Sequence, residues 1–281
     1  METFFLMFQS VILGIVEGIS EFLPISSTGH LIIFENITGF NRQSAAFVEM
    51  YTYVIQLGAI LAIVVLYRHK IIDTLIHLIP QKNNFRASGF YFWFSIAVAC
   101  IPGFIAQMLL DDLAETYLFN AVAVAITLFV GGILLIYAEK HLRGKNEGQT
   151  QTILTLKQAL LIGSFQCLAI IPGMSRSAST IIGGWVAGLS TVAAAEFSFF
   201  LAIPVMFGMS FLEIIKFGGL GALSPSELAA LGVGFVVSFL VALMVVDRFI
   251  RYLKEKPMRV FAIYRMIFAV AVLAAGLAGF F

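Results

Sequence analysis

Charged residues are scarce in this sequence. Only 12 % of its 281 residues are Asp, Glu, Lys or Arg, whereas about 25 % are charged in soluble domains. Hydrophobic residues make up 60 %, and long apolar runs recur along the whole chain. This composition excludes a soluble globular domain and indicates a polytopic helical membrane protein. The formal net charge of +1 gives no reason to expect a nucleic-acid partner.

Cysteine is rare as well. Cys100 and Cys167 lie far apart within apolar segments, so no disulfide framework is expected. Signs of a secretory signal are also missing, because Glu2 stands where a signal peptide carries positive charge and no A-x-A-like site follows. We therefore expect the N-terminal segment to belong to the mature protein.

Six apolar runs are long enough to cross about 30 Å of hydrocarbon. They lie near residues 44–67, 91–110, 117–138, 190–215, 226–247 and 260–280. Two further apolar regions, 1–40 and 155–188, are each interrupted by a proline and a Ser-rich stretch. We expect each half of these two regions to be too short to span. The sequence therefore predicts two re-entrant helix–loop–helix hairpins, whose irregular backbone must be buried in protein or line a wet cavity.

Lys and Arg are distributed unequally between the two faces of this arrangement. Thirteen of the 17 fall on one face, in the loops near 68–90, 139–157 and 248–259. Two fall on the other face, and Arg176 and Arg265 fall within membrane segments. Basic loops mark the cytoplasmic side, so both termini are predicted to lie outside the cytoplasm, across the bacterial inner membrane. Arg265 is expected to be structural and to extend toward the cytoplasmic interface.

The two interrupted regions resemble each other. Residues 14–33 align with residues 163–182, with Glu17 opposite Gln166 and a one-residue slip before the proline. Three spans separate the hairpins, and three is odd, so the second copy is predicted to be inverted relative to the first.

The predicted fold class is therefore an all-α polytopic membrane protein with an inverted-topology repeat. It has six transmembrane helices and two re-entrant hairpins in a single membrane domain, residues 1–281. Its halves are residues 1–140 and residues 155–281. One hairpin enters from outside and the other from the cytoplasm, so their polar tips are expected to meet near the midplane.

The first tip carries two carboxylates. Glu17 and Glu21 are four residues apart and so lie on one face of a helix. Each ionised group costs about 2.5–3.5 kcal/mol within the membrane on insertion scales. The pair predicts either a site for a divalent cation, Mg²⁺ or Ca²⁺, or an acid–base pair. A water-facing helix or an arginine partner are the structural alternatives.

Hydroxyl groups follow where the returning helix is expected to begin. Pro24 breaks the first helix, and Ser26, Ser27, Thr28 and His30 come next. Hydroxyls and free N–H groups at a helix start bind anions. N-capping would account for one hydroxyl, but not for three together with a histidine.

The second tip adds a guanidinium. Ser175, Arg176 and Ser177 repeat the arrangement after another proline. Arginine is suited to binding a phosphate through two parallel hydrogen bonds. Neutralisation of Glu17 or Glu21 by Arg176 is an alternative that is compatible with this role. Together the tips predict a site for a phosphate or diphosphate carried on a membrane-soluble tail.

At these residues the chain closely resembles the bacterial undecaprenyl-diphosphatase family, the integral-membrane type linked to bacitracin resistance. EGISEFLPISSTGH (17–30) is similar to the first family motif, with Ser20 where Thr is common. PGMSRSAST (172–180) is similar to the second, with Ala178 where Gly is usual. Other family-like patches are IQLGAILA (55–62), EFSFFLAIP (196–204) and YR (264–265). The resemblance implies hydrolysis of undecaprenyl diphosphate to undecaprenyl phosphate and inorganic phosphate, which recycles the lipid carrier for cell-wall synthesis.

The chemistry and the resemblance together predict roles for individual residues. The predicted catalytic residues are Glu21, Ser27, His30 and Arg176. The predicted substrate-binding residues are Ser26, Thr28, Ser175, Arg176, Ser177 and Thr180, and the predicted metal ligands are Glu17 and Glu21. Either Ser27 takes the phosphoryl group transiently, or His30 activates a water while the hydroxyls only hold phosphate oxygens.

Two other classes of function stay open. One is a transporter or flippase for lipid phosphates, because inverted repeats with paired hairpins are a transporter architecture. The other is a channel or scaffold without chemistry. The Ser–His–carboxylate set favours the enzyme, since transport of an anion needs no proton donor. The expected partners are a polyprenyl diphosphate and membrane lipids. The identity of the metal, the lipid chain length and a homodimer are left undecided, while the family implies a site that opens outward.

Overall fold

A computed structural model describes residues 2–79, 85–118, 120–143 and 154–277, and in these residues it contains helices and no strand. The α-helices are α1 (Glu2–Ser20), α2 (Ser27–Thr38), α3 (Ala45–Leu66), α4 (Arg68–Ile76), α5 (Gly89–Leu118), α6 (Ala121–Leu142), α7 (Leu156–Gln166), α8 (Arg176–Val186), α9 (Thr191–Lys216), α10 (Pro225–Glu255) and α11 (Arg259–Leu277). Short 3₁₀ helices are Phe40–Arg42, Phe85–Ala87, Cys167–Ile170 and Leu220–Ala222. The all-α prediction is confirmed.

Side-chain caps explain where many of these helices begin. In each case a side-chain oxygen of the residue before the helix accepts a hydrogen bond from a backbone N–H of the first turn. The capping residues are Ser26, Ser44, Asn120, Thr155, Ser175, Ser190 and Ser224. The helix boundaries therefore follow from local sequence.

Seven of the described helices have the length and composition to cross a membrane: α1, α3, α5, α6, α9, α10 and α11. Six of them correspond to the six predicted runs. The seventh, α1, corrects the prediction that each half of residues 1–40 is too short to span. Its helix continues without a break as far as Ser20 and provides an 18-residue apolar stretch. In the second interrupted region, α7 and α8 have 11 residues each, which is too short to span.

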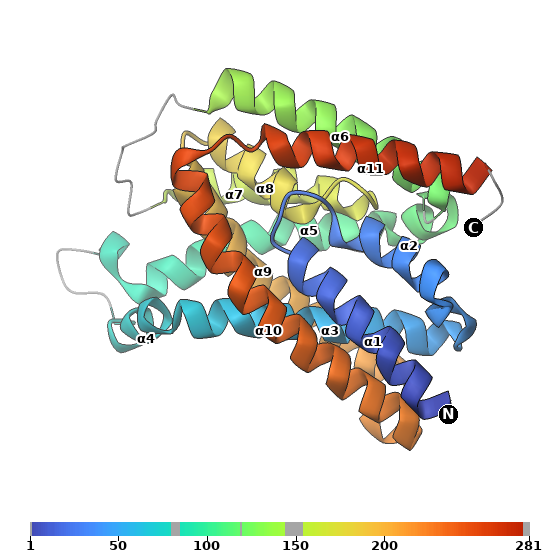
Figure 1. Cartoon of the computed structure of the whole chain (residues 1–281). Coiled ribbons are helices and arrows are strands. Elements are labelled where there is room, and N and C mark those ends of the chain that lie inside the picture. Colours follow the sequence, from blue (N-terminus) through green and yellow to red (C-terminus); the bar gives the residue numbers. More distant parts are fainter. Residues whose placement is uncertain (1, 80–84, 119, 144–153, 278–281) are drawn as a thin grey trace.

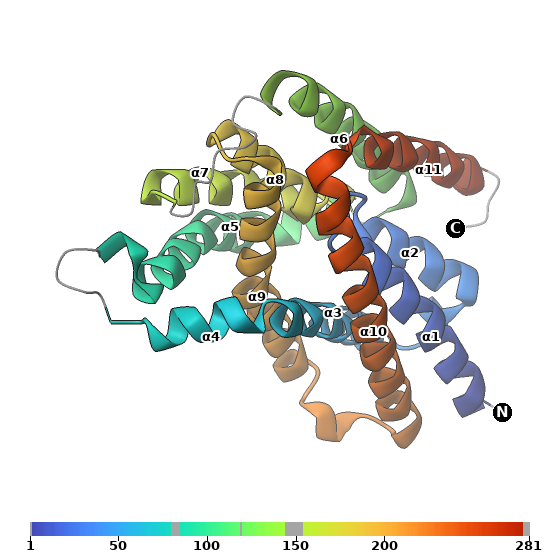
Figure 2. The same ribbon diagram turned by 60° about the vertical axis from the view of Figure 1, so that its left-hand side comes forward.

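The helices bring the basic loops to one side of the molecule. In Figure 1 the α3–α4 junction, the end of α6 and the α10–α11 junction lie on the left. The start of α1 and the end of α11 lie on the right. Figure 2 shows that α4 continues outward from the end of α3. The molecule therefore separates the regions near the three basic loops from the two chain ends.

Glycines on α1 bring that helix close to α10. A Cβ added at Gly14 would lie 2.7 Å from the carbonyl oxygen of Gly234, and one added at Gly18 would lie 2.7 Å from that of Ser238. Small residues at such positions let helix backbones approach closely in a membrane. Glu17 lies between these two glycines in the sequence and is fully buried.

Candidate functional site

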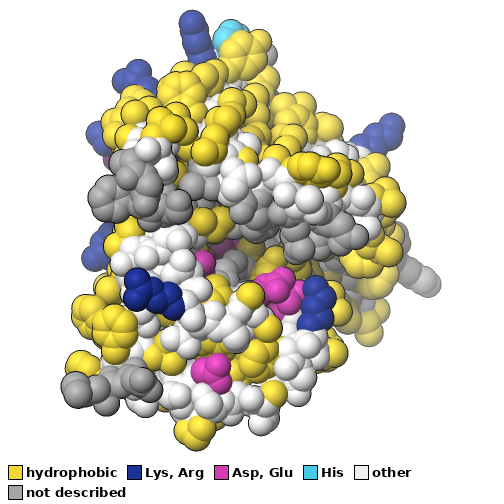
Figure 3. All heavy atoms as spheres, turned by 90° about the vertical axis from the view of Figure 1, so that its right-hand side faces the viewer, with side chains coloured by type: hydrophobic (Ala, Val, Ile, Leu, Met, Phe, Trp, Pro, Cys, Tyr) yellow, Lys and Arg dark blue, Asp and Glu magenta, His cyan; other side chains and the backbone are white. Residues whose placement is uncertain are grey.

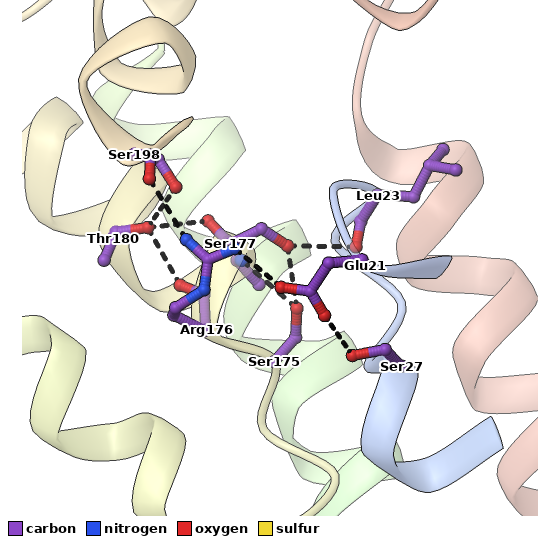
Figure 4. Close-up of polar contacts among 9 residues, drawn as sticks. Glu21, Leu23, Ser27, Ser175, Arg176, Ser177, Thr180 and Ser198 are labelled. Atoms are coloured by element: carbon purple, nitrogen blue, oxygen red, sulfur yellow. Dashed lines mark hydrogen bonds and ion pairs between the residues drawn. The ribbon is translucent and has the colours of Figure 1, made fainter. Parts of the chain in front are cut away.

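The two predicted tips lie against each other. The Ser177 hydroxyl of the second tip donates a hydrogen bond of 2.9 Å to the backbone carbonyl of Leu23 in the first tip. Arg176 Nη2 lies 2.8 Å from Glu21 Oε1. Figure 4 shows these contacts between the loop after α1 and the start of α8. Two segments distant in sequence thus form one polar cluster.

Both tips contain a serine in the same unusual backbone conformation. Ser26 and Ser175 each have φ 72°, and they are the only non-glycine residues with positive φ in the described part of the chain. Such a conformation costs about 1–3 kcal/mol. Each hydroxyl accepts a hydrogen bond of 3.3 Å from the first turn of its helix, at Gly29 N and Ala178 N respectively. The two serines occupy equivalent positions in the aligned segments.

Glu21 links a hydroxyl to a guanidinium. Ser27 Oγ donates a hydrogen bond of 2.6 Å to Glu21 Oε2, while Arg176 Nη2 donates to Glu21 Oε1. The second arm of the guanidinium, Arg176 Nη1, donates to the backbone carbonyl of Ser198 at 3.0 Å. The Glu21 and Arg176 side chains are only 3 % and 9 % exposed. The carboxylate is therefore placed to accept a proton from Ser27 while it is paired with a positive charge.

Ser177 and Thr180 lie outside the cavity and contact the residues that form the site. Neither residue lines the cavity that Glu21, Ser27 and Arg176 line. Thr180 Oγ1 and Ser198 Oγ form a hydrogen bond of 2.6 Å. The contacts that the structure gives Ser177 and Thr180 hold the second tip in place. Their predicted contact with substrate stays a prediction.

His30 faces the last helix. One ring nitrogen, Nδ1, lies 2.8 Å from the Ser26 carbonyl oxygen, and Nε2 lies 2.9 Å from the Tyr264 hydroxyl. The ring stacks on Phe268 at a centroid distance of 4.0 Å. His30 does not line the cavity. Through Nδ1 the ring contacts the backbone of Ser26, the residue that precedes Ser27.

Glu17 is fully buried and lies close enough to Glu21 for the two carboxyl groups to interact. Both of its carboxylate oxygens lack a hydrogen bond to any described residue. A carboxylate in such surroundings requires a bound proton or a cation, because an isolated buried charge is very costly. No group of three or more His, Cys, Asp or Glu residues in the described ranges forms a metal site. The Glu17 and Glu21 oxygens therefore fit a hard cation only if substrate or water supplies further oxygens.

A cavity of about 880 Å³ connects the cluster to the surface. Its polar end is lined by Glu21, Ser26, Ser27, Thr28, Ser175 and Arg176. Its apolar wall includes Leu31, Ile32, Phe104, Ile170, Pro204, Met209 and Leu212. A polar end beside an apolar wall suits an amphiphilic ligand with an anionic head group.

The cavity reaches the side of the molecule on which the chain ends lie. Asn41 and Glu49, near the α2–α3 junction, line it and are exposed. Figure 1 places that junction on the right, with the termini. Figure 3 views this face and shows acidic side chains in and beside a recess among apolar ones.

Several site residues were not singled out from the sequence. Gln56 and Gln166 both line the cavity, and Gln166 Oε1 is buried without a hydrogen bond to the described residues. Ser198 belongs to the family-like patch EFSFFLAIP, which was the available signal. Arg265 does not extend to the interface as expected. It is fully buried, and it contacts the backbone of both tips.

Comparison with known proteins identifies the family of the chain. A family described as bacitracin resistance protein BacA matches residues 10–271. The chain is 63 % identical to a Ruminiclostridium cellulolyticum protein named undecaprenyl-diphosphatase, over 100 % of both chains. It is 48 % identical to a Clostridium novyi protein of the same name, with 99 % of this chain and 98 % of the relative covered. It is 47 % identical to undecaprenyl-diphosphatase 2 of Clostridioides difficile, with 95 % and 94 % covered. With such matches along nearly its whole length, the chain belongs to the BacA family.

Proposed function

We propose that this protein hydrolyses undecaprenyl diphosphate to undecaprenyl phosphate and inorganic phosphate, and so recycles a lipid carrier of cell-wall synthesis. The relatives are named for this activity. The observation that carries the proposal is the Ser27–Glu21–Arg176 cluster at the polar end of an amphiphilic cavity. The apolar wall accommodates polyprenyl chain, and the tips receive the diphosphate.

Ser27 is the proposed nucleophile. Its Oγ attacks the terminal phosphorus, its proton passes to Glu21, and the bond from phosphorus to the bridging oxygen breaks to release undecaprenyl phosphate. Water then hydrolyses the phosphoserine and yields inorganic phosphate. The 2.6 Å hydrogen bond from Ser27 to Glu21 supports this assignment over activation by His30, whose ring nitrogens engage Ser26 and Tyr264.

Arg176 is proposed to stabilise charge on the transferred phosphoryl group. Phosphoryl transfer depends mainly on positioning and electrostatic stabilisation. Arg176 lines the polar end of the cavity, which places the residue beside a bound phosphate. The N-termini of α2 and α8, which begin at the two tips, add further N–H donors for an anion.

Glu17 and Glu21 are proposed to hold one Mg²⁺ or Ca²⁺ together with substrate phosphate oxygens and water. When bound, the cation neutralises charge on the diphosphate. The two oxygens of Glu17 without hydrogen bonds support this role. A protonated Glu17 that shares its proton with Glu21 is the competing state, and metal binding distinguishes the two.

The decisive experiment for the activity uses purified full-length protein in detergent. We expect phosphate release from a polyprenyl diphosphate in the presence of Mg²⁺ or Ca²⁺, and none from an Arg176→Ala variant. If the wild-type protein releases no phosphate with either ion, a transporter of lipid phosphates becomes the leading function.

We further propose that the two halves form an inverted-topology repeat, with re-entrant hairpins at α1–α2 and α7–α8 and with both termini outside the cytoplasm. Helix α1 has the length of a span, but the α2–α3 junction lies on the same side of the molecule as the start of α1 (Figure 1), as expected of a pair that returns to the side from which it enters. The matching φ of Ser26 and Ser175, the short α7 and α8, and the segregation of basic loops from the termini support it. The cavity would then open outward. Reporter fusions at the C-terminus should report a non-cytoplasmic location, and a cytoplasmic one would contradict the arrangement.

A further inference from the structure

The guanidinium of one buried arginine, Arg265, contacts the backbone of both tips. Arg265, on α11, donates through Nη1 to the Pro24 carbonyl at 3.5 Å, and through Nη2 to the Met174 carbonyl at 3.2 Å and to the Gly173 carbonyl. Pro24 belongs to the first tip, and Gly173 and Met174 belong to the second. The arginine is fully buried. A single side chain thus binds the backbones that carry Ser27 and Arg176.

Arg265 also brings a positive charge that no described carboxylate pairs with. Within the described ranges, no ion pair involves it, and its Nε has no hydrogen bond. A buried charge ordinarily has a partner of opposite sign. Here the hydrogen-bond partners of the guanidinium are backbone carbonyls of the tips, so its charge remains available to an anion bound on their other side.

Gly131 leaves space for the Arg265 side chain because it has no Cβ. A Cβ added at Gly131, on α6, would collide with Arg265 Nη2 and would lie 2.9 Å from its Cζ. The preceding residue, Tyr264, holds His30. Helix α11 therefore fixes both the tips and the first turn of α2.

We propose that Arg265 is a positioning residue that keeps the two tips in register, and that its charge strengthens anion binding at the site. This rests on the proposed function. Ser27 and Glu21 come from one tip and Arg176 from the other, so their alignment depends on how the tips sit against each other. A displacement of 1 Å at a catalytic group costs about 100-fold in rate.

Two substitutions at Arg265 separate geometry from charge. Arg265→Lys keeps the charge, but a compact ammonium cannot reproduce the planar fork between the tips. We expect its kcat to fall about 100-fold. Its KM and its affinity for inorganic phosphate should stay within about threefold of wild type. Arg265→Met removes the charge as well, and its phosphate affinity should fall about tenfold or more.

A second pair of variants moves the arginine without replacing it. Gly131→Ala should lower kcat about tenfold or more by displacing the guanidinium, with phosphate affinity retained. Gly232→Ala is the matched control, because a Cβ at Gly232 meets nothing within 4 Å. Arg248→Lys is the control for the arginine substitution, since Arg248 is exposed and its Nη1 contacts the Met244 carbonyl of its own helix.

The measurements are steady-state kinetics normalised to folded protein, and binding of inorganic phosphate by thermal shift, which needs no turnover. An Arg265→Lys kcat within about threefold of wild type would overturn the positioning role, as would equal effects of Gly131→Ala and Gly232→Ala. Unchanged phosphate affinity in Arg265→Met would overturn the charge role. An inactive wild-type protein contradicts the proposed function instead, and the phosphate-binding measurements still decide the role of the charge.

Discussion

The two tips share a backbone geometry and differ in chemistry. Each has a serine with φ 72° that caps the helix after it. The residue following that serine is Ser27 in the first tip and Arg176 in the second. Both residues bind the same Glu21 carboxylate. The same local frame therefore delivers a hydroxyl to one carboxylate oxygen and a guanidinium to the other.

A second pair of equivalent positions shows that the halves are not interchangeable. Glu17 and Gln166 are opposite each other in the alignment of the two regions. Glu17 is fully buried and does not line the cavity, whereas Gln166 lines it. The carboxyl group of Glu17 therefore lies away from the cavity, whereas the neutral amide residue at the equivalent position, Gln166, lines it.

Removal of the Ser27 hydroxyl should have the largest effect. We expect Ser27→Ala to lower kcat about 10⁴-fold, because loss of a nucleophile removes the covalent route. Reaction at a chiral phosphate should proceed with net retention, since two displacements occur. Net inversion would establish direct attack by water, and Ser27 would then only hold phosphate oxygens.

Arg176→Lys should lower kcat/KM about 10³-fold, almost as far as Arg176→Ala. The guanidinium binds Glu21 and the Ser198 carbonyl at once, and the residue lines the cavity. An ammonium group carries the same charge but lacks the planar arrangement of N–H donors that a guanidinium has. Steady-state kinetics in detergent provide the measurement. A lysine variant within about tenfold of wild type would show that charge alone suffices.

Glu17→Gln should lower activity about 100-fold and weaken binding of Mg²⁺ or Ca²⁺. Calorimetric titration of the metal alone provides a readout that does not depend on turnover. The matched control is Glu255→Gln, which makes the same substitution at an exposed glutamate at the end of α10. Full activity in excess chelator would remove the metal from the scheme and leave Glu17 and Glu21 as an acid–base pair.

Much of this architecture could be predicted from the sequence, because its signals are local. Long apolar runs indicated six of the seven candidate spans, and prolines followed by hydroxyl residues marked both tips. The tips were also expected to meet, and contact of Arg176 with Glu17 or Glu21 was one of the alternatives for that residue. The length of α1 differs from the prediction, because the helix accommodates Glu17 and continues to Ser20, so that the part of the chain before Pro24 is long enough to span.

Contacts between distant helices could not be predicted in this way. Local sequence does not reveal that the His30 ring faces Tyr264 and Phe268 on α11, which lie far along the chain. The partner of Arg176 on α9 is a backbone carbonyl, and a carbonyl carries no side-chain signature. An arginine near the start of an apolar run, such as Arg265, does not reveal which way its side chain points. Tertiary packing decides all three.

The smallest predicted effect concerns the two serine caps. In Ser26→Ala and Ser175→Ala the helix loses a cap, which costs about 0.5–2 kcal/mol. In the glycine variants this loss is offset, because glycine adopts positive φ without the steric cost of a Cβ, about 1–2 kcal/mol. The glycine variant should therefore be more stable than the alanine variant at both positions.

Ser44 is the matched control for these caps, because it forms the same kind of cap, to Phe47 N at 3.3 Å, with an ordinary φ of −59°. There the stability difference between the glycine and alanine variants should be smaller by about 1 kcal/mol, since no strain is relieved. Thermal unfolding in detergent measures all six variants. Equal differences at Ser26 and Ser175 would support a shared frame. A difference at one tip that matches Ser44 would show that only the other tip is strained, and the equivalence of the two tips would fail.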